Sequence, residues 1–197
     1  MELNYDTRVC TEPIELREAP EGGRPTLLGR AIIYNEISTL LYEPQLGLFR
    51  ERILPGAVTK TLADGHDIRA VLVHDKNRVI GRTSNSTLKL IDGPDCMRCE
   101  IIPPNTNEGR DTIEMVREGY ATNMSFGMSV PRGGSRMIME NGQRIHEIRE
   151  LKLTEVSIIM GNPAYSSTNI SLREVINEIP AIGTKLSAVR ETILRML

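Results

Sequence analysis

The chain lacks tryptophan, and aromatic residues make up only 4% of its 197 residues. Aliphatic side chains must therefore fill most of the hydrophobic core. The chain also lacks an excess of positive charge, since its formal net charge is -2 at pH 7. Nucleic-acid-binding domains usually carry a basic patch or stripe, so we expect no nucleic-acid partner.

Long hydrophobic runs are absent as well. No apolar stretch approaches the about 20 residues that a bilayer-spanning helix needs, so we expect no membrane partner. Residues 1–6 contain no cationic region followed by an apolar stretch, so a secretory signal is not expected. The chain is long enough to bury one good core, which predicts a single domain.

Cysteine is scarce, with only Cys10, Cys96 and Cys99 present. An odd number this small does not support a disulfide framework. Cys96 and Cys99 have CxxC spacing, but a structural zinc site needs four ligands and the sequence has no second such pair. Histidines are the remaining candidates for completing a zinc site. The simpler interpretation is two strand cysteines that stay reduced in a cytosol.

Turn-forming residues, by contrast, are frequent in the first two-thirds of the chain and divide it into short segments. The segments between the turns are rich in β-favouring residues. They predict strands over residues 26–34, 68–74, 86–91, 97–102, 124–130, 144–151 and 153–160. Short strands at this spacing are typical of a barrel or a sandwich, so we predict a mainly β fold with helices.

Helical patterns interrupt and follow the predicted strands. Residues 55–62 and 107–118 are predicted helices, the second with acidic groups early and Gly119 beyond its end. Residues 171–197 have the apolar spacing of two amphipathic helices. We therefore predict a main domain over residues 1–170 and a helical tail after it, either part of the same domain or a dimerisation or processing segment.

Three of the predicted strands each carry one side chain capable of catalysis, namely His74, Ser125 and Glu155. Alternation along a strand puts Ser125 on a face that otherwise carries only Gly127 and Ser129. Such a face makes a poor core but leaves room for a substrate backbone. Ser129 lies two positions, or roughly 6–7 Å, further along the strand.

Serine, histidine and a carboxylate are the groups that nucleophilic acyl transfer needs. A serine hydroxyl is a weak nucleophile until an adjacent base takes its proton, and imidazole suits that role because its pKa lies near neutrality. A carboxylate then orients the imidazole and stabilises its protonated form. Alternation places Glu155 on the same face as Leu153, where burial of a carboxylate requires a partner. The absence of a GxSxG motif argues against an α/β-hydrolase.

Each of these residues also has a purely structural interpretation, which the spacing does not exclude. His74 would then be a hydrogen-bonded strand residue, with Asp75 capping a turn beside it. Ser125 would be an ordinary strand serine. Glu155 would form an ion pair with an arginine such as Arg82 or Arg149.

Short motifs in a fixed order point to a known family. They are GRAIIYN at 29–35, FRERILPGA at 49–57, LVHD at 72–75, IGRT at 80–83, MSFGM at 124–128, LTEVS at 153–157 and PAY at 163–165. In this order they resemble the prohead proteases of tailed bacteriophages. These are serine endopeptidases that mature procapsids and look distantly related to the herpesvirus assemblins.

The resemblance implies roles for particular residues. His74 matches the family's base, Ser125 its nucleophile and Glu155 the third member of the triad. Assemblins use a second histidine in that third position, so the carboxylate departs from the more distant family. The loop after the strand of Glu155 would supply the backbone N–H groups of Gly161 and Asn162 as an oxyanion hole, with an ordinary turn as the alternative.

Other candidate residues are weaker. Asp75 follows His74 directly and so points to the opposite face of a strand, which makes it a poor partner for that imidazole. His66 lies in a turn-like segment and His146 on a hairpin, so we expect both at the surface. Arg82 either positions substrate or braces the fold, and we favour the bracing role.

The resemblance further implies a small herpesvirus-protease-like β-barrel surrounded by helices, without a metal or an organic cofactor. The predicted activity is cleavage of the major capsid protein and its scaffold region inside the assembling prohead, in the bacterial host cytoplasm. Self-cleavage and a homodimer are further options. The alternatives are a non-catalytic virion assembly protein that binds the scaffold region, and a hydrolase of non-peptide esters or amides.

Overall fold

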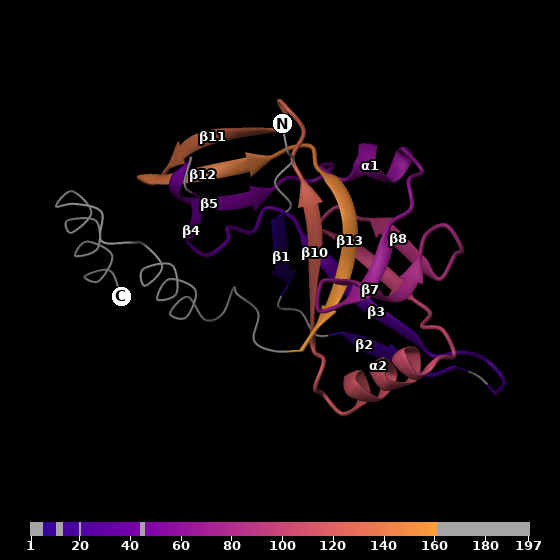
Figure 1. The fold of residues 1–197 in the computed structure, drawn as a ribbon. Helices are drawn as coiled ribbons and strands as arrows, with labels where there is room; N and C mark the ends of the chain where they lie inside the picture. Colours follow the sequence, from indigo (N-terminus) through magenta and orange to yellow (C-terminus); the bar gives the residue numbers. More distant parts are fainter. Residues whose placement is uncertain (1–5, 11–13, 20, 44–45, 161–197) are drawn as a thin grey trace.

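The computed structural model describes residues 6–10, 14–19, 21–43 and 46–160. Strands dominate this part of the chain (Figure 1). In chain order the elements are β1 (Asp6–Cys10), β2 (Glu15–Arg17), β3 (Thr26–Ile33), β4 (Leu41–Glu43), β5 (Gly47–Ile53), α1 (Thr59–Ala63), β6 (Arg69–Leu72), β7 (Asp75–Arg82), β8 (Leu88–Asp92), β9 (Cys96–Ile101), α2 (Asn107–Arg117), β10 (Asn123–Ser129), β11 (Ser135–Glu140), β12 (Gln143–Ile148) and β13 (Lys152–Ile159). The predicted mainly β fold is therefore confirmed.

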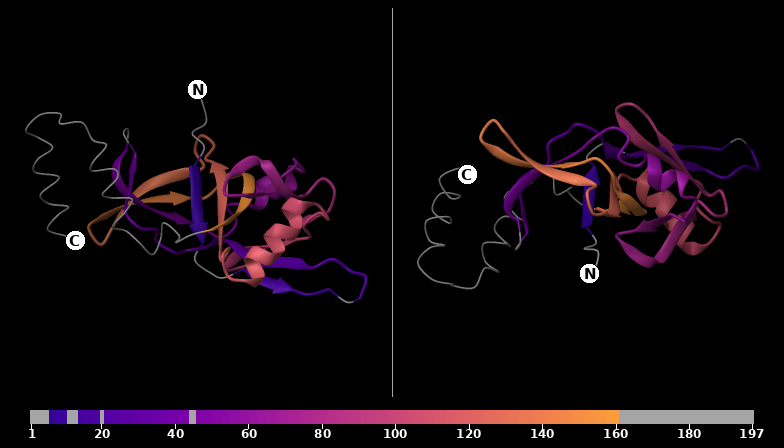
Figure 2. Two further views of the ribbon diagram at one scale, coloured as in Figure 1. Left: turned by 60° about the horizontal axis from the view of Figure 1, so that its bottom comes forward. Right: turned by 90° about the horizontal axis from the view of Figure 1, so that it is seen from above.

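The strands form three sheets. The largest has the order β1-β10-β13-β6-β7, and its central pair, β10 and β13, is antiparallel. A second sheet has the order β2-β3-β9-β8, and a third has the order β11-β12-β5-β4. Both views in Figure 2 show the third sheet extending to the side of the molecule away from α2. Each sheet ends in two different edge strands in the described part of the chain, so the predicted closed barrel is not confirmed.

The hydrophobic core lies between the first two sheets. Met124 and Phe126 of β10 belong to the same buried cluster as Leu27 of β3 and Cys99 of β9. The Sγ atom of Cys99 lies 3.3 Å from the Sδ atom of Met124, and a Cβ atom at Gly29 would come within 2.2 Å of that Sδ. Burial of an apolar side chain contributes about 1.5–3 kcal/mol to the stability of the fold. The face of β10 that carries Met124 and Phe126 is therefore the face that packs in the core.

Several predicted elements are confirmed with small shifts at their ends. Predicted strands 26–34, 97–102 and 124–130 correspond to β3, β9 and β10. The helix predicted over 107–118 is α2, where the Oγ1 atom of Thr106 accepts a hydrogen bond from Gly109 N, and Gly119 beyond the end has a φ of 74°. These elements agree with prediction because their signals are local.

Two predicted elements are shorter than expected. The helix predicted over 55–62 begins only at Thr59, because Gly56 has a φ of 85° and residues before Thr59 form turns. The strand predicted over 68–74 ends at Leu72, because the next two residues have left-handed backbone. The second difference places His74 in a turn instead of in a strand.

Cys96 and Cys99 both lie on β9, and both side chains are buried. Neither forms a disulfide bond among the described residues. They are three positions apart on one strand, so their side chains point to opposite faces of the sheet. No group of three or more histidine, cysteine or carboxylate side chains in the described ranges is arranged to hold a metal ion. No helix among the described residues is long and apolar enough to cross a membrane.

Arg82 forms the contacts that the bracing role favoured by the sequence requires. Its guanidinium donates hydrogen bonds to the Oδ2 atom of Asp67, one of them from Nε over 2.8 Å. These bonds lower the pKa of Asp67 to about 2. Asp67 also accepts from Ser84 N, so one carboxylate ties the start of β6 to the end of β7. The predicted tail over 171–197 and the division at residue 170 lie outside the described residues.

Candidate active site

His74 lies in a strained two-residue turn. Leu72 at the end of β6 pairs with Asp75 at the start of β7, and only Val73 and His74 connect them. Their φ angles are 43° and 59°, both in the left-handed region. Two-residue hairpin turns need this conformation, but glycine and asparagine normally supply it, and it is unfavourable for a β-branched residue such as Val73. The neighbouring structure must therefore hold the turn in place.

Three hydrogen bonds to strand β13 hold the turn in place. Val73 N donates to Ile158 O over 2.9 Å, and His74 N donates to the Oγ atom of Ser157 over 2.9 Å. The imidazole of His74 donates from Nδ1 to the Oε1 atom of Glu155 over 2.8 Å. With the proton on Nδ1, the neutral ring has Nε2 available as an acceptor, which is the form that a general base requires.

Ser125 lies on the same face of the sheet as these groups. In the antiparallel pair of β10 and β13, Ser125 is directly opposite Ser157, and Gly127 is opposite Glu155. Directly opposite residues point their side chains to the same face. Because Ser157 and Glu155 both bond to His74, the structure brings the three predicted residues together on one face.

Burial differs among the members of this cluster. Ser125 is 0% exposed and Glu155 is 3% exposed, whereas the side chain of His74 keeps 26% of its surface exposed. A buried carboxylate is stable only with a partner, and His74 provides one. The imidazole is the most accessible of the three side chains and lies between the buried carboxylate and solvent.

The alternation predicted for Glu155 is wrong, and a β-bulge explains why. Met128 pairs with Leu153, yet Gly127 pairs with Glu155, so Thr154 is an extra residue in β13. The Oγ1 atom of Thr154 donates to Gly127 O over 2.8 Å. Leu153 therefore faces the core, and the bulge turns Glu155 to the opposite face. Without that extra residue the carboxylate would point into the hydrophobic core.

Asp75 has a different partner. Its Oδ1 atom accepts a hydrogen bond from Asn77 N over 2.9 Å, which is a local turn contact. Glu155, rather than Asp75, is the carboxylate bonded to His74.

The prediction that His146 lies at the surface is wrong. Its side chain is 18% exposed, and its Nε2 atom lies 2.7 Å from the Oγ atom of Ser135. Its Nδ1 atom lies 3.8 Å from the Oε2 atom of Glu51, a buried carboxylate on β5. The third sheet thus holds a second serine–histidine–glutamate set. Its carboxylate is beyond hydrogen-bond distance from the imidazole, so it does not orient the ring as Glu155 orients His74.

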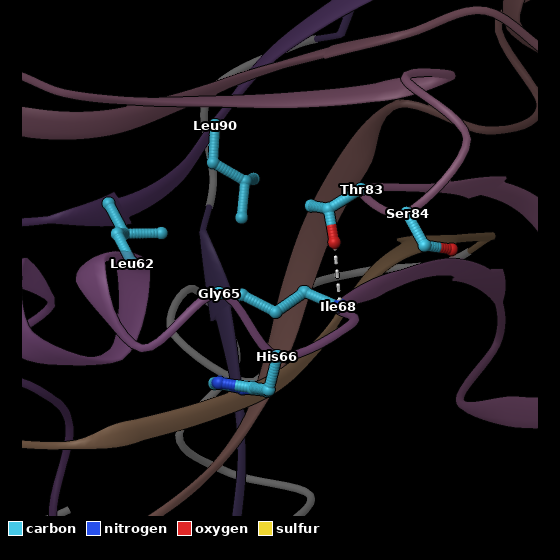
Figure 3. Close-up of a pocket in the computed structure, with 7 residues that line it drawn as sticks. All are labelled: Leu62, Gly65, His66, Ile68, Thr83, Ser84 and Leu90. Carbon is cyan, nitrogen blue, oxygen red and sulfur yellow. Dashed lines mark hydrogen bonds between the residues drawn. The ribbon is translucent and has the colours of Figure 1, made fainter.

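His66 is also less exposed than predicted, since it lines a cavity. Its Nε2 atom donates to Leu153 O over 2.8 Å, and its Nδ1 atom is buried without a hydrogen-bond partner among the residues described. Figure 3 shows the cavity, whose volume is about 300 Å³, and the hydrogen bond from Ile68 N to the Oγ1 atom of Thr83 beside it. The lining residues are Leu62, Gly65, His66, Ile68, Thr83, Ser84 and Leu90. None of the residues clustered around His74 lines this cavity.

The sequence did not single out Ser157, although it lies in the same motif as Glu155. Two positions along a strand return to the same face, so its presence beside the carboxylate was an available signal. Gly161 and Asn162, the predicted oxyanion-hole donors, lie outside the described residues.

Comparisons with known proteins found a matching family and a similar fold. A family model described as caudovirus prohead serine protease matches residues 12–180. The solved structure of the bacteriophage T4 capsid assembly protease, gp21, is similar to the fold with a TM-score of 0.52 and 13% sequence identity. That similarity covers 82% of this chain and 100% of the T4 chain, and at this identity it supports the fold alone. No curated protein sequence matches the chain.

Proposed function

The chain belongs to the caudovirus prohead serine protease family, and we propose that Ser125, His74 and Glu155 are its catalytic triad. The hydrogen bond of 2.8 Å from His74 Nδ1 to the buried Glu155 carries this proposal. That bond supports the tautomer that leaves Nε2 able to accept a proton, on the face where Ser125 lies.

In the proposed reaction the Oγ atom of Ser125 attacks the carbonyl carbon of a peptide bond, and its proton passes to His74 Nε2. Glu155 stabilises the resulting imidazolium. The C–N bond then breaks, and His74 gives the proton to the departing amine. Water attacks the acyl-enzyme with His74 as base, which releases the new carboxyl end and restores Ser125.

The oxyanion of the tetrahedral intermediates requires hydrogen-bond donors. We propose the backbone N–H groups of Gly161 and Asn162, which follow β13 in the sequence after Met160. Glu155 lies earlier in the same segment. The proposed carboxylate and the proposed oxyanion-hole donors therefore come from one continuous stretch of the chain, which supports this choice.

The proposed substrates are the phage major capsid protein and its scaffold region, cleaved inside the assembling prohead in the bacterial host cytoplasm. Self-cleavage is a further proposed reaction. Membership of a prohead protease family supports this choice. Co-expression with capsid precursor tests it: the wild-type protein is expected to process the precursor, whereas the Ser125→Ala variant is expected to leave it intact.

Asp75 provides a test of which carboxylate assists His74. The Asp75→Asn variant keeps an oxygen that can accept from Asn77 N but loses the charge. Since Asp75 does not bond to His74, the Asp75→Asn variant is expected to process the precursor at a rate within about threefold of wild type. A time course of processing by the two proteins measures this. A loss of 100-fold or more, on the order expected for a triad member, would instead assign the orienting role to Asp75.

A further inference from the structure

Ser157 occupies a central place beside the proposed triad. It is fully buried on β13, on the same face as Glu155, and lies directly opposite Ser125 on β10. On its other side it pairs with Val71 of β6, the strand that leads into the turn of His74. Its hydroxyl therefore lies where the nucleophile's strand, the carboxylate's strand and the histidine's strand meet.

The hydroxyl of Ser157 bonds to the backbone of the histidine rather than to its ring. Its Oγ atom accepts from His74 N over 2.9 Å. The parallel ladder between β13 and β6 ends at the pair of Ile158 and Leu72, and Val73 N still donates to Ile158 O. At His74 the side-chain oxygen of Ser157 takes the place of a backbone carbonyl.

This bond acts on the strained part of the chain. Both turn residues have positive φ angles, and neither is a glycine or an asparagine. Left-handed backbone at such residues persists only where the surrounding contacts enforce it. Loss of the bond to His74 N would leave a partly buried N–H group without its acceptor and free the turn to relax. The imidazole would then move away from Glu155 and Ser125.

We infer that Ser157 is a positioning residue, whose hydroxyl holds the turn so that the imidazole of His74 meets both Glu155 and Ser125. This inference rests on the proposed triad. A serine with only a structural role would change the stability of the fold but not the reactivity of Ser125 or the state of the His74 ring.

The test compares Ser157→Ala with a matched control, Ser38→Ala. Ser38 is also buried, and its Oγ atom also accepts from a backbone N–H group, that of Glu51, over 2.8 Å. The probe is a fluorophosphonate, whose P–F bond breaks as the serine oxygen bonds to phosphorus and fluoride leaves. The rate of labelling is measured at a fixed pH, together with the downfield Nδ1–H proton signal of His74 in the NMR spectrum.

Ser157→Ala is expected to label about 10- to 100-fold more slowly than wild type, in keeping with misplacement of a catalytic group by about 1 Å. Its Nδ1–H signal is expected to weaken, because the imidazole moves away from Glu155. Ser38→Ala keeps both properties of the wild type. An equal labelling rate and an equal Nδ1–H signal in Ser157→Ala and Ser38→Ala would overturn the inference.

Failure of the proposed triad gives a different result. In that case the wild-type protein itself takes no label at Ser125. The Nδ1–H signal still reports on the turn, because it requires only His74 and Glu155 and is also measurable in a Ser125→Ala background.

Discussion

The Ser125→Ala variant is expected to process capsid precursor at least about 10⁴-fold more slowly than the wild-type protein, because removal of a nucleophile removes the covalent pathway altogether. What remains is the contribution of binding and of the oxyanion hole. Ser125 is fully buried, but the substitution deletes only one oxygen atom. The free energy of unfolding is therefore expected to change by no more than about 1–2 kcal/mol.

Co-expression of capsid precursor with each variant measures this, with unfolding curves to show that the fold is intact. Ser135→Ala is the matched control, since Ser135 lies 2.7 Å from the Nε2 atom of His146 in the second serine–histidine–glutamate set. That control is expected to process the precursor normally. Complete processing by folded Ser125→Ala would remove Ser125 from the mechanism, and loss of processing in Ser135→Ala alone would move the reaction centre to the third sheet.

Glu155→Gln is expected to slow processing by about 10²- to 10⁴-fold. Glutamine has nearly the same shape and keeps an oxygen facing His74, so the geometry survives while the negative charge does not. The imidazolium formed during the reaction then lacks its stabilising partner, and the amide can hold the wrong tautomer of the ring. Rates of precursor processing, measured with equal amounts of folded protein, give the size of the effect.

Glu51→Gln is the control for this prediction. Glu51 and Glu155 are both 3% exposed glutamates facing a histidine, but Glu51 lies 3.8 Å from His146. Its substitution is expected to leave the rate near that of the wild type. If Glu155→Gln processed as fast as Glu51→Gln, the carboxylate would have only a structural role.

The strand position of Ser125 was predictable because its signal is local. Ser125 lies in a run of small and apolar residues whose alternation continues through β10, so the sequence already showed which face it would share with Gly127. The segment of α2 was predictable for the same reason, since the signals that begin and end it lie next to the helix in the chain. They are the N-cap Thr106 before it and Gly119 just beyond it.

The geometry around His74 was less predictable, because it depends on pairing between distant segments. The bulge at Thr154 exists only in relation to β10, and strict alternation sends Glu155 to the wrong face. The turn at Val73 and His74 carries no glycine or asparagine, so it gave no turn signal and the strand seemed to continue. Its stability comes from β13, more than 80 positions away for the contacts of His74.

Strands β5, β7 and β11 were missed for a related reason. They carry many charged side chains, as in the sequence GLFRERI of β5, and such segments score poorly as strands. In the third sheet such charges pair across strands, as when Arg52 of β5 bonds to Glu140 of β11 and Glu147 of β12. Pairing of this kind is visible only once the sheet has formed.

Mapping of the residue that reacts with a fluorophosphonate tests the central claim most directly. The wild-type protein is labelled and digested, and the modified peptide is identified by mass spectrometry, with His74→Ala analysed in parallel. We expect one adduct, on Ser125, that is lost in His74→Ala. An adduct on Ser135, an adduct on Ser125 that persists without His74, or no adduct in the wild-type protein would contradict the proposed triad.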